Sequence, residues 1–131
     1  MIIINKGMLN KVALTLTEKS TLYPFTTYNL FVLKNESNSQ QYVFTATDIS
    51  NYKARFNLFN ISENFLTEDA LNGIISLSGN TSQWSYRIFE SLTPYSANTL
   101  SISSTTGVVL ERGRLILNGF EQNNTINQIY L

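Results

Sequence analysis

The alternation of apolar and polar residues along the chain is typical of a β protein, and its clearest signal lies in residues 28–48. Two runs rich in β-branched and aromatic residues, 28–35 and 41–48, flank the polar linker 36–40, which is the pattern of a β-hairpin. Residues 30–33 are all apolar, so we expect their strand to lie inside a sheet with both faces covered. The hairpin is therefore predicted to be the centre of the fold.

Shorter β patterns precede and follow this hairpin. Residues 12–17, 56–62 and 83–90 alternate apolar with small or polar side chains, as strands with one buried face do. Further strands are predicted at residues 73–78 and 107–117.

Two irregular features are predicted between and within these strands. Residues 48–55 are expected to form one helical turn, with Asp48 or Ser50 capping its free amides. Gly113 interrupts the last long strand, where we predict a β-bulge.

Together these elements predict an all-β protein, an antiparallel immunoglobulin-like β-sandwich of seven to eight strands with one short helical turn. A length of 131 residues fits one domain, residues 1–131. Residues 1–10 and 118–131 are expected to be terminal arms or edge strands. The apolar triplet Ile2–Ile4 favours an edge strand of the domain itself over a free arm.

The composition argues against several kinds of chemistry. The chain has no Cys and no His, which removes disulfides, thiolate metal sites, the commonest general base and the usual zinc ligand. Nine basic and nine acidic residues cancel, so no long-range field would attract nucleic acid or an anionic membrane. We therefore expect a non-enzymatic protein without cofactor or metal. It has no recognisable signal peptide or membrane span and is expected to be made in the cytoplasm.

One group of acidic residues could bind calcium. Glu63, Glu68 and Asp69 fall close together in a segment predicted to be a loop. The segment lacks the alternating ligands of a dedicated calcium loop, so a solvated loop is the preferred interpretation.

A second acidic pair could serve glycoside hydrolysis. Glu90 and Glu111 lie in strands predicted to be neighbours, and a glycosidase needs two facing carboxyl groups. Cross-strand ion pairs with Arg87, Arg112 and Arg114 explain these two residues better.

Three tyrosines in predicted loops, Tyr23, Tyr52 and Tyr95, could stack on sugars at one end of a sandwich. Tyrosines in such places are more often half-buried, with the hydroxyl at the rim. Tyr52 in particular is expected to pin the corner that follows Asp48.

Six runs of residues, taken in order, resemble a family of small tailed-phage virion proteins. The runs are residues 14–22 (LTLTEKSTL), 28–35 (YNLFVLKN), 42–48 (YVFTATD), 52–57 (YKARFN), 84–90 (WSYRIFE) and 110–115 (LERGRL). The family occurs in phages of Bacteroidetes and their marine relatives, and in crAss-like phages it is similar to the auxiliary capsid protein that decorates the head. The resemblance covers roughly residues 12–117.

This resemblance implies a structural virion component, present in many copies, that binds the major capsid protein and other virion proteins and reinforces the head. It implies location in the capsid after synthesis in the host bacterial cytoplasm. A tail, collar or head-fibre protein is the alternative position. A module that binds glycans or the host surface is the alternative function.

The hydrophobic ends of the chain are the candidate docking segments, by strand addition to a partner sheet. The candidate interface residues are Ile2, Ile3, Ile4, Ile129, Tyr130 and Leu131. Deletion of residues 1–6 is expected to abolish incorporation into particles and to leave the domain folded.

Overall fold

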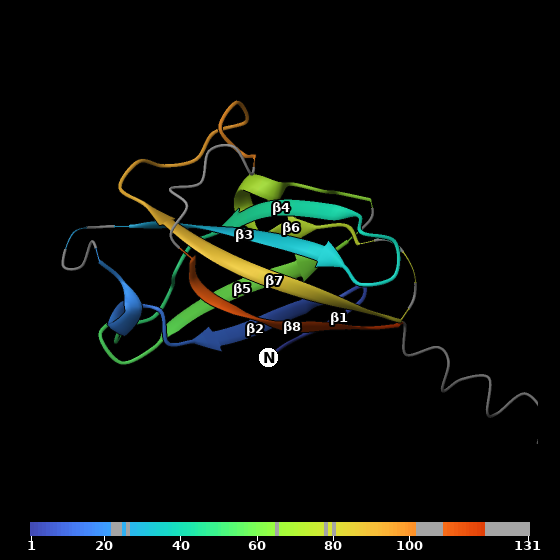
Figure 1. Ribbon diagram of the computed structural model, residues 1–131, viewed down its shortest axis with the longest axis horizontal. Helices are drawn as coiled ribbons and strands as arrows, with labels where there is room; N and C mark the ends of the chain where they lie inside the picture. Colours follow the sequence, from blue (N-terminus) through green and yellow to red (C-terminus); the bar gives the residue numbers. More distant parts are fainter. Residues whose placement is uncertain are drawn as a thin grey trace, which may run out of the picture.

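The structure is a computed structural model that describes residues 1–21, 25, 27–64, 66–77, 79, 81–101 and 109–119. These residues form eight strands and two short 3-10 turns, η1 and η2 (Figure 1). The elements are β1 (Ile2–Asn5), β2 (Leu9–Leu14), η1 (Thr17–Lys19), β3 (Tyr28–Asn35), β4 (Gln41–Ala46), β5 (Asn57–Glu63), η2 (Ala70–Asn72), β6 (Ile74–Ile75), β7 (Ser82–Ser91) and β8 (Val109–Asn118). The all-β prediction is confirmed. Within the described part of the chain, no helix is long and apolar enough to cross a membrane.

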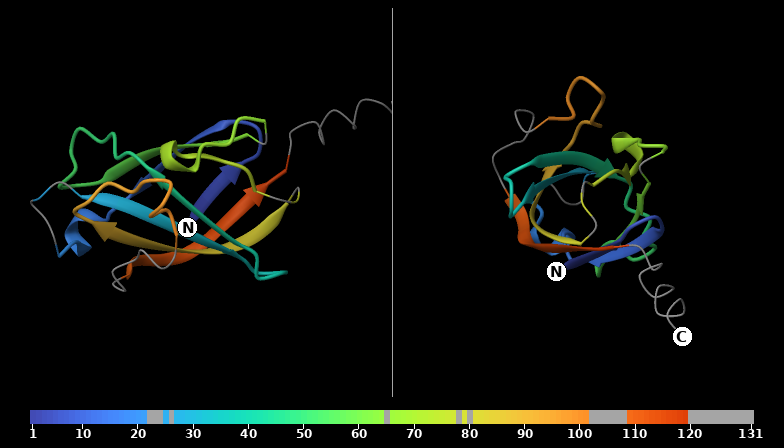
Figure 2. Two further views of the ribbon diagram at one scale, coloured as in Figure 1. Left: turned by 90° about the horizontal axis from the view of Figure 1, so that it is seen from above. Right: turned by 90° about the vertical axis from the view of Figure 1, so that its right-hand side faces the viewer.

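The strands form two sheets around one core. The larger sheet has the order β1-β8-β7-β3-β4, and the smaller has the order β2-β5-β6. Seen along the strands, the larger sheet curls into a half-barrel that faces the smaller one (Figure 2). The inner faces of both sheets bury the large side chains, among them Phe31, Phe59, Trp84 and Tyr86.

The predicted hairpin is confirmed, and its second strand ends at Ala46. β3 pairs antiparallel with β4 on one side and with β7 on the other. Residues 30–33 are all buried, as predicted for a strand covered on both faces. Phe31 and Leu33 face the main core, whereas Leu30 and Val32 face outward and join a second apolar cluster with Phe89.

The sheets are mixed, so the prediction of an antiparallel sandwich is wrong for two strand pairs, and the fold is not a clear immunoglobulin sandwich. β1 runs parallel to β8, and β5 runs parallel to β6. The first and last strands meet from distant parts of the sequence, so no hairpin sets their relative direction. β5 and β6 are joined by a crossing segment that contains η2, which is the kind of connection that parallel strands require.

The prediction of a single helical turn at residues 48–55 is confirmed in part. The amides of Arg55 and Phe56 both donate to the Tyr52 carbonyl and close one hydrogen-bonded turn, but no helix forms there, and the two 3-10 turns lie elsewhere. The predicted capping does occur. Asp48 Oδ1 accepts from the Ser50 amide, and Ser50 Oγ accepts from the Tyr52 amide, each at 3.0 Å. These side-chain acceptors stabilise the corner without a helix.

The predicted bulge at Gly113 is displaced. The irregularity between β7 and β8 lies at Ile88 and Phe89, opposite the start of β8. Gly113 pairs with Tyr86, and a Cβ at Gly113 would lie 2.6 Å from the Tyr86 hydroxyl. Glycine is therefore required here because the tyrosine ring lies directly against the backbone.

Candidate functional site

The predicted partner interface at the N-terminus divides into buried and exposed side chains. Ile2 and Ile4 point into the core and are 2% and 0% exposed, whereas Ile3 lies on the outer face and is 49% exposed. The second half of the prediction, residues 129–131 (Ile129, Tyr130 and Leu131), lies outside the described residues. The interface itself stays a prediction, and Ile3 is the β1 isoleucine whose side chain a partner could reach.

β1 forms one edge of the larger sheet. It pairs with β8 from Ile2↔Leu115 to Asn5↔Asn118, and no other described strand pairs with it. The side chain of Asn10 ties its end to β2, by accepting from the Asn5 amide at 2.9 Å and donating to the Asn5 carbonyl at 3.2 Å. An edge of this kind is a template for an added strand.

Exposed apolar side chains accompany this edge in the sequence. Met1 and Leu9 are 75% and 57% exposed, and Met8 is also exposed. Single exposed apolar residues are normal on protein surfaces. Several of them close in sequence to an edge strand make this edge a candidate contact surface.

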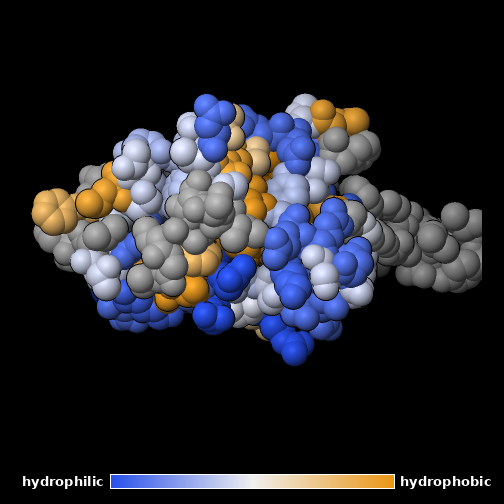
Figure 3. Space-filling view, turned by 45° about the horizontal axis from the view of Figure 1, so that its top comes forward, coloured by the Kyte–Doolittle hydropathy of each residue, from blue (hydrophilic) through white to orange (hydrophobic). Residues whose placement is uncertain are grey.

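Of the tyrosines proposed as a sugar platform, Tyr52 and Tyr95 do not line the same hollow. Tyr23 lies outside the described residues, and Tyr52 is an exposed corner residue whose ring is tilted against that of Phe56, with 6.4 Å between ring centroids. Tyr95 lines a hollow of about 270 Å³ over β4, together with Tyr28. The surface around β4 shows a strip of apolar residues among hydrophilic ones (Figure 3). Sequence reasoning missed Tyr28 because it begins a strand.

The carboxylates proposed as calcium ligands diverge. Glu68 accepts from the Tyr42 hydroxyl, and Asp69 accepts from the Asn72 side chain at 2.7 Å. Glu63 ends β5 and is completely buried, in the same inward phase as Phe59 and Ile61. The described residues contain no group of three or more potential metal-binding acidic side chains.

Two backbone amides and one ammonium group surround the Glu63 carboxylate. Its Oε1 accepts from the Gly7 amide at 3.0 Å, and its Oε2 accepts from the Leu77 amide at 3.1 Å. The Lys6 ammonium lies 3.6 Å from Oε2 and donates to the carbonyls of Leu77 and Gly79, each at 2.7 Å. The charge of Glu63 is balanced by Lys6, and both of its oxygens accept hydrogen bonds, so we interpret this as a structural ion pair.

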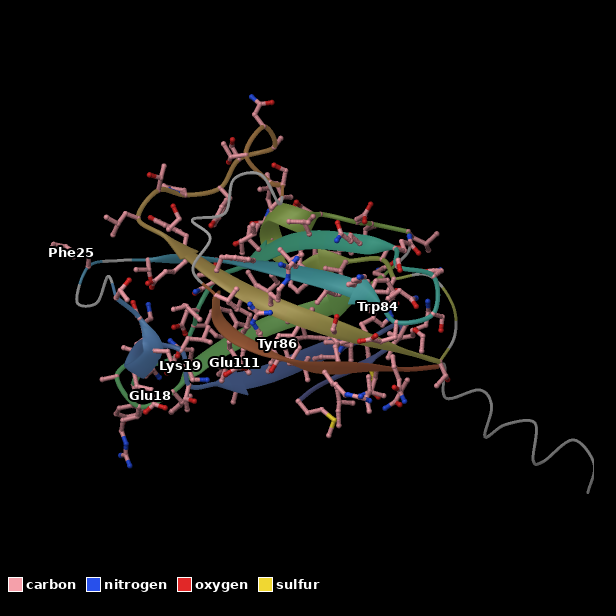
Figure 4. The ribbon with its side chains drawn as sticks, in the orientation of Figure 1. Glu18, Lys19, Phe25, Trp84, Tyr86 and Glu111 are labelled. Carbon is pink, nitrogen blue, oxygen red and sulfur yellow. The ribbon has the colours of Figure 1, made fainter. Side chains whose placement is uncertain are left out.

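Glu111 has a different partner from the one expected. β7 and β8 are neighbours as predicted, but Glu111 pairs with Lys19 of η1, at 2.8 Å, and not with an arginine. Its second oxygen accepts from the Tyr86 hydroxyl at 2.7 Å. Figure 4 shows Lys19, Glu111 and Tyr86 in a row from η1 toward the middle of β7, with Trp84 farther along β7. Burial, reinforced by the Glu111 carboxylate, raises the pKa of Tyr86.

Glu90 is satisfied by the residues that follow η1. It is 2% exposed and accepts from Ser20 Oγ at 2.5 Å and from both the amide and the hydroxyl of Thr21 at 3.0 Å. The cavity beside it measures about 20 Å³, which is room for one water molecule and not for a sugar. Glu90 and Glu111 therefore each serve to dock the η1 segment onto the larger sheet.

Comparison of the chain with family models, with curated proteins and with solved structures finds no match.

Proposed function

We propose that this protein is a structural component of a tailed-phage virion, an auxiliary protein that binds the major capsid protein and reinforces the head. The ordered runs described above support this proposal, since they resemble proteins of that class. The observation that carries it at the level of residues is the β1 edge, where a strand with no described partner strand on its outer side presents the exposed Ile3.

An edge strand suits a role of this kind. A partner strand that adds to β1 would gain main-chain hydrogen bonds, and outward side chains such as Ile3 would supply specificity. Repetition over a symmetric shell makes many weak contacts act together, so each interface can be small. The same surface would serve a tail, collar or head-fibre position, which is the alternative within this proposal. Synthesis in the host cytoplasm and many copies per particle follow from it.

An immunoglobulin-like fold remains the narrower structural proposal. The order β8-β7-β3-β4 corresponds to the G-F-C-C′ order of variable-type domains, and the β2–β5 pair corresponds to B and E. The parallel β5–β6 pair departs from that plan. An experimental structure in which β6 pairs antiparallel with β5 would support the immunoglobulin assignment, and one that keeps it parallel would end it.

The test of the proposed function is a single charge placed on the β1 edge. Lysine on an edge strand opposes strand addition, and Ile3 is exposed enough for Ile3→Lys to fold normally. We expect Ile3→Lys to lower the number of copies per purified particle by about tenfold or more, for a loss of roughly 1.4 kcal/mol per contact. Particle reconstruction and quantitative mass spectrometry measure this number.

Leu92→Lys is the matched control. Leu92 is 53% exposed and lies in the segment after β7, away from β1. It should be incorporated normally. Equal incorporation of both variants would reject the β1 edge as the docking surface, and absence of the wild-type chain from particles would reject the virion role.

Deletion of residues 1–6 is a poor test. It removes the core side chains of Ile2 and Ile4, and it removes Lys6 from the buried Glu63. We therefore expect this truncation to unfold the domain, contrary to the expectation from sequence, and loss of incorporation would then say nothing about docking.

A further inference from the structure

Two hollows lie beside β4. They measure about 270 and 430 Å³, both have Leu71 in their walls, and their floors include β4 residues. We call these two hollows together the β4 groove. The smaller hollow is close to the lower limit for small-molecule sites, and the pair offers room for a short chain of ring-sized units.

Tyr95 gives the smaller hollow an unused hydrogen-bonding group. Its hydroxyl is buried and has no hydrogen-bond partner among the described residues. Burial raises the pKa of Tyr95, and the Ser91 hydroxyl lies close enough to Tyr95 to lower that pKa by a smaller amount. The two hydroxyls do not reach full hydrogen-bonding geometry, and Ser91 Oγ instead accepts from the Thr93 amide at 3.0 Å. Buried polar groups normally have partners, and a bound hydroxyl-bearing molecule would supply one here.

The rest of the lining suits a molecule with both polar and apolar faces. Tyr28, Thr47 and Lys53 bring polar groups to the smaller hollow, and Pro94 and Leu71 bring apolar walls. Tyr28, Thr47 and Lys53 are all exposed at the surface. Sugar rings combine hydroxyl edges with apolar faces that pack on aromatic rings, and this lining matches them.

The charge of the groove selects among sugars. Glu68 and Asp69 line the larger hollow, and Asp48 lines the smaller one, against the single cation Lys53 among the described lining residues. Like charges would repel sialic acids, uronic acids and sulfated sugars from such a surface. An uncharged sugar meets no such repulsion.

We propose that the β4 groove binds a neutral oligosaccharide, with one sugar ring in the smaller hollow hydrogen-bonded to Tyr95 and the chain continuing past Leu71. This inference rests on the groove alone and does not depend on the virion role.

The test uses the full chain labelled with ¹⁵N and four neutral disaccharides: maltose, cellobiose, lactose and chitobiose. We expect at least one of them to shift amide resonances of residues 27–29, 45–48 and 71 and of Tyr95 in a saturable way. Tyr95→Phe removes only the hydroxyl and should weaken that binding roughly three- to tenfold. Thr47→Val, at an exposed position, should also weaken it and guards against a folding defect in the first variant.

Tyr52→Phe is the matched control, because Tyr52 does not line the groove and its hydroxyl should be dispensable. Saturable shifts confined to other parts of the surface would overturn the proposal. So would unchanged affinity in Tyr95→Phe, or no shift with any of the four sugars at roughly 10 mM, where even weak sites fill. None of these outcomes bears on particle incorporation, so the two proposals fail separately.

Discussion

The two ends of the domain each bury a glutamate, and they stabilise it in different ways. Glu63 receives two backbone amides and a lysine that is itself nearly buried, with side chains 0% and 9% exposed. Glu90, near the other end of β7, accepts from two hydroxyls and one amide, and no cation of the described residues pairs with it. The first site contains a charge pair, and the second contains a carboxylate held by neutral donors.

The difference indicates how each end is constructed. Lys6 and Glu63 join the turn after β1 to the segment before β7, so their ion pair closes the domain at that end. Glu90 and Glu111 hold Ser20 and Lys19, so they tie η1 and the residue after it to the larger sheet. Breaking a buried pair leaves an uncompensated charge, whereas neutral donors can reorient toward a neutral acceptor.

Replacing the glutamate by glutamine at both Glu63 and Glu90 is expected to give the largest difference in stability between the two sites. Glu63→Gln removes the negative charge 3.6 Å from the Lys6 ammonium and turns a donor toward one of two backbone amides. We expect a loss of about 3–5 kcal/mol in the free energy of unfolding. Glu90→Gln keeps an acceptor, and the Ser20 and Thr21 hydroxyls can accept from the new amide, so we expect about 1 kcal/mol.

Urea unfolding of the two variants under identical conditions measures this difference. Lys6→Met is the companion variant for the first end and should cost a similar amount, because it leaves Glu63 buried without a cation. Equal losses in Glu63→Gln and Glu90→Gln would show that the ion pair contributes nothing beyond its hydrogen bonds.

Alkaline pH tests the contribution of Tyr86, whose hydroxyl donates to Glu111, the residue that holds Lys19 of η1. Its pKa is raised by burial and by Glu111, so it stays protonated in the folded protein when unfolded tyrosine ionises near pH 10. The folded state then binds more protons than the unfolded state, and stability falls as pH rises above about 10. Tyr86→Phe should be less stable at neutral pH and should flatten this decline by roughly 1.4 kcal/mol per pH unit. Parallel curves for the two proteins between pH 9 and 11 would contradict this assignment.

Local patterns in the sequence were sufficient to predict the faces of the strands. The period of two in residues 83–90 correctly placed Trp84, Tyr86 and Ile88 in the core, and the apolar run 30–33 correctly indicated a strand covered on both sides. These assignments depend only on neighbouring residues. The strand faces therefore followed from sequence.

The buried glutamates were missed, although the same period contained the signal. Glu63 continues the inward phase of Phe59 and Ile61, and Glu90 continues that of Tyr86 and Ile88. A carboxylate at an inward-facing position of a strand is buried, and because a buried charge needs a partner, the pattern predicts one. The partners themselves, such as Lys6 for Glu63, lie far away in the sequence and could not be identified from spacing.

The parallel β1–β8 pair escaped prediction for the same reason. Its register, Ile2↔Leu115, joins the two extremes of the chain, and nothing local specifies direction. The β4 groove was also invisible, because Tyr28 and Tyr95 are brought together by the packing of separate segments.

The smallest expected effect concerns the ion pair between Lys19 of η1 and Glu111 of β8. Lys19 is 41% exposed and Glu111 is 14% exposed, so water and salt screen their attraction at 2.8 Å far more than at Glu63. We expect Lys19→Met to cost at most about 1 kcal/mol, and raising the salt concentration to 1 M to remove most of that difference. Glu111 keeps the Tyr86 hydroxyl as a donor in this variant, so its carboxylate is never left without a partner. Thermal unfolding of wild type and Lys19→Met at low and high salt measures both quantities. A loss of more than about 2 kcal/mol that persists in 1 M salt would place this end in the same class as the Lys6–Glu63 end and erase the contrast between them.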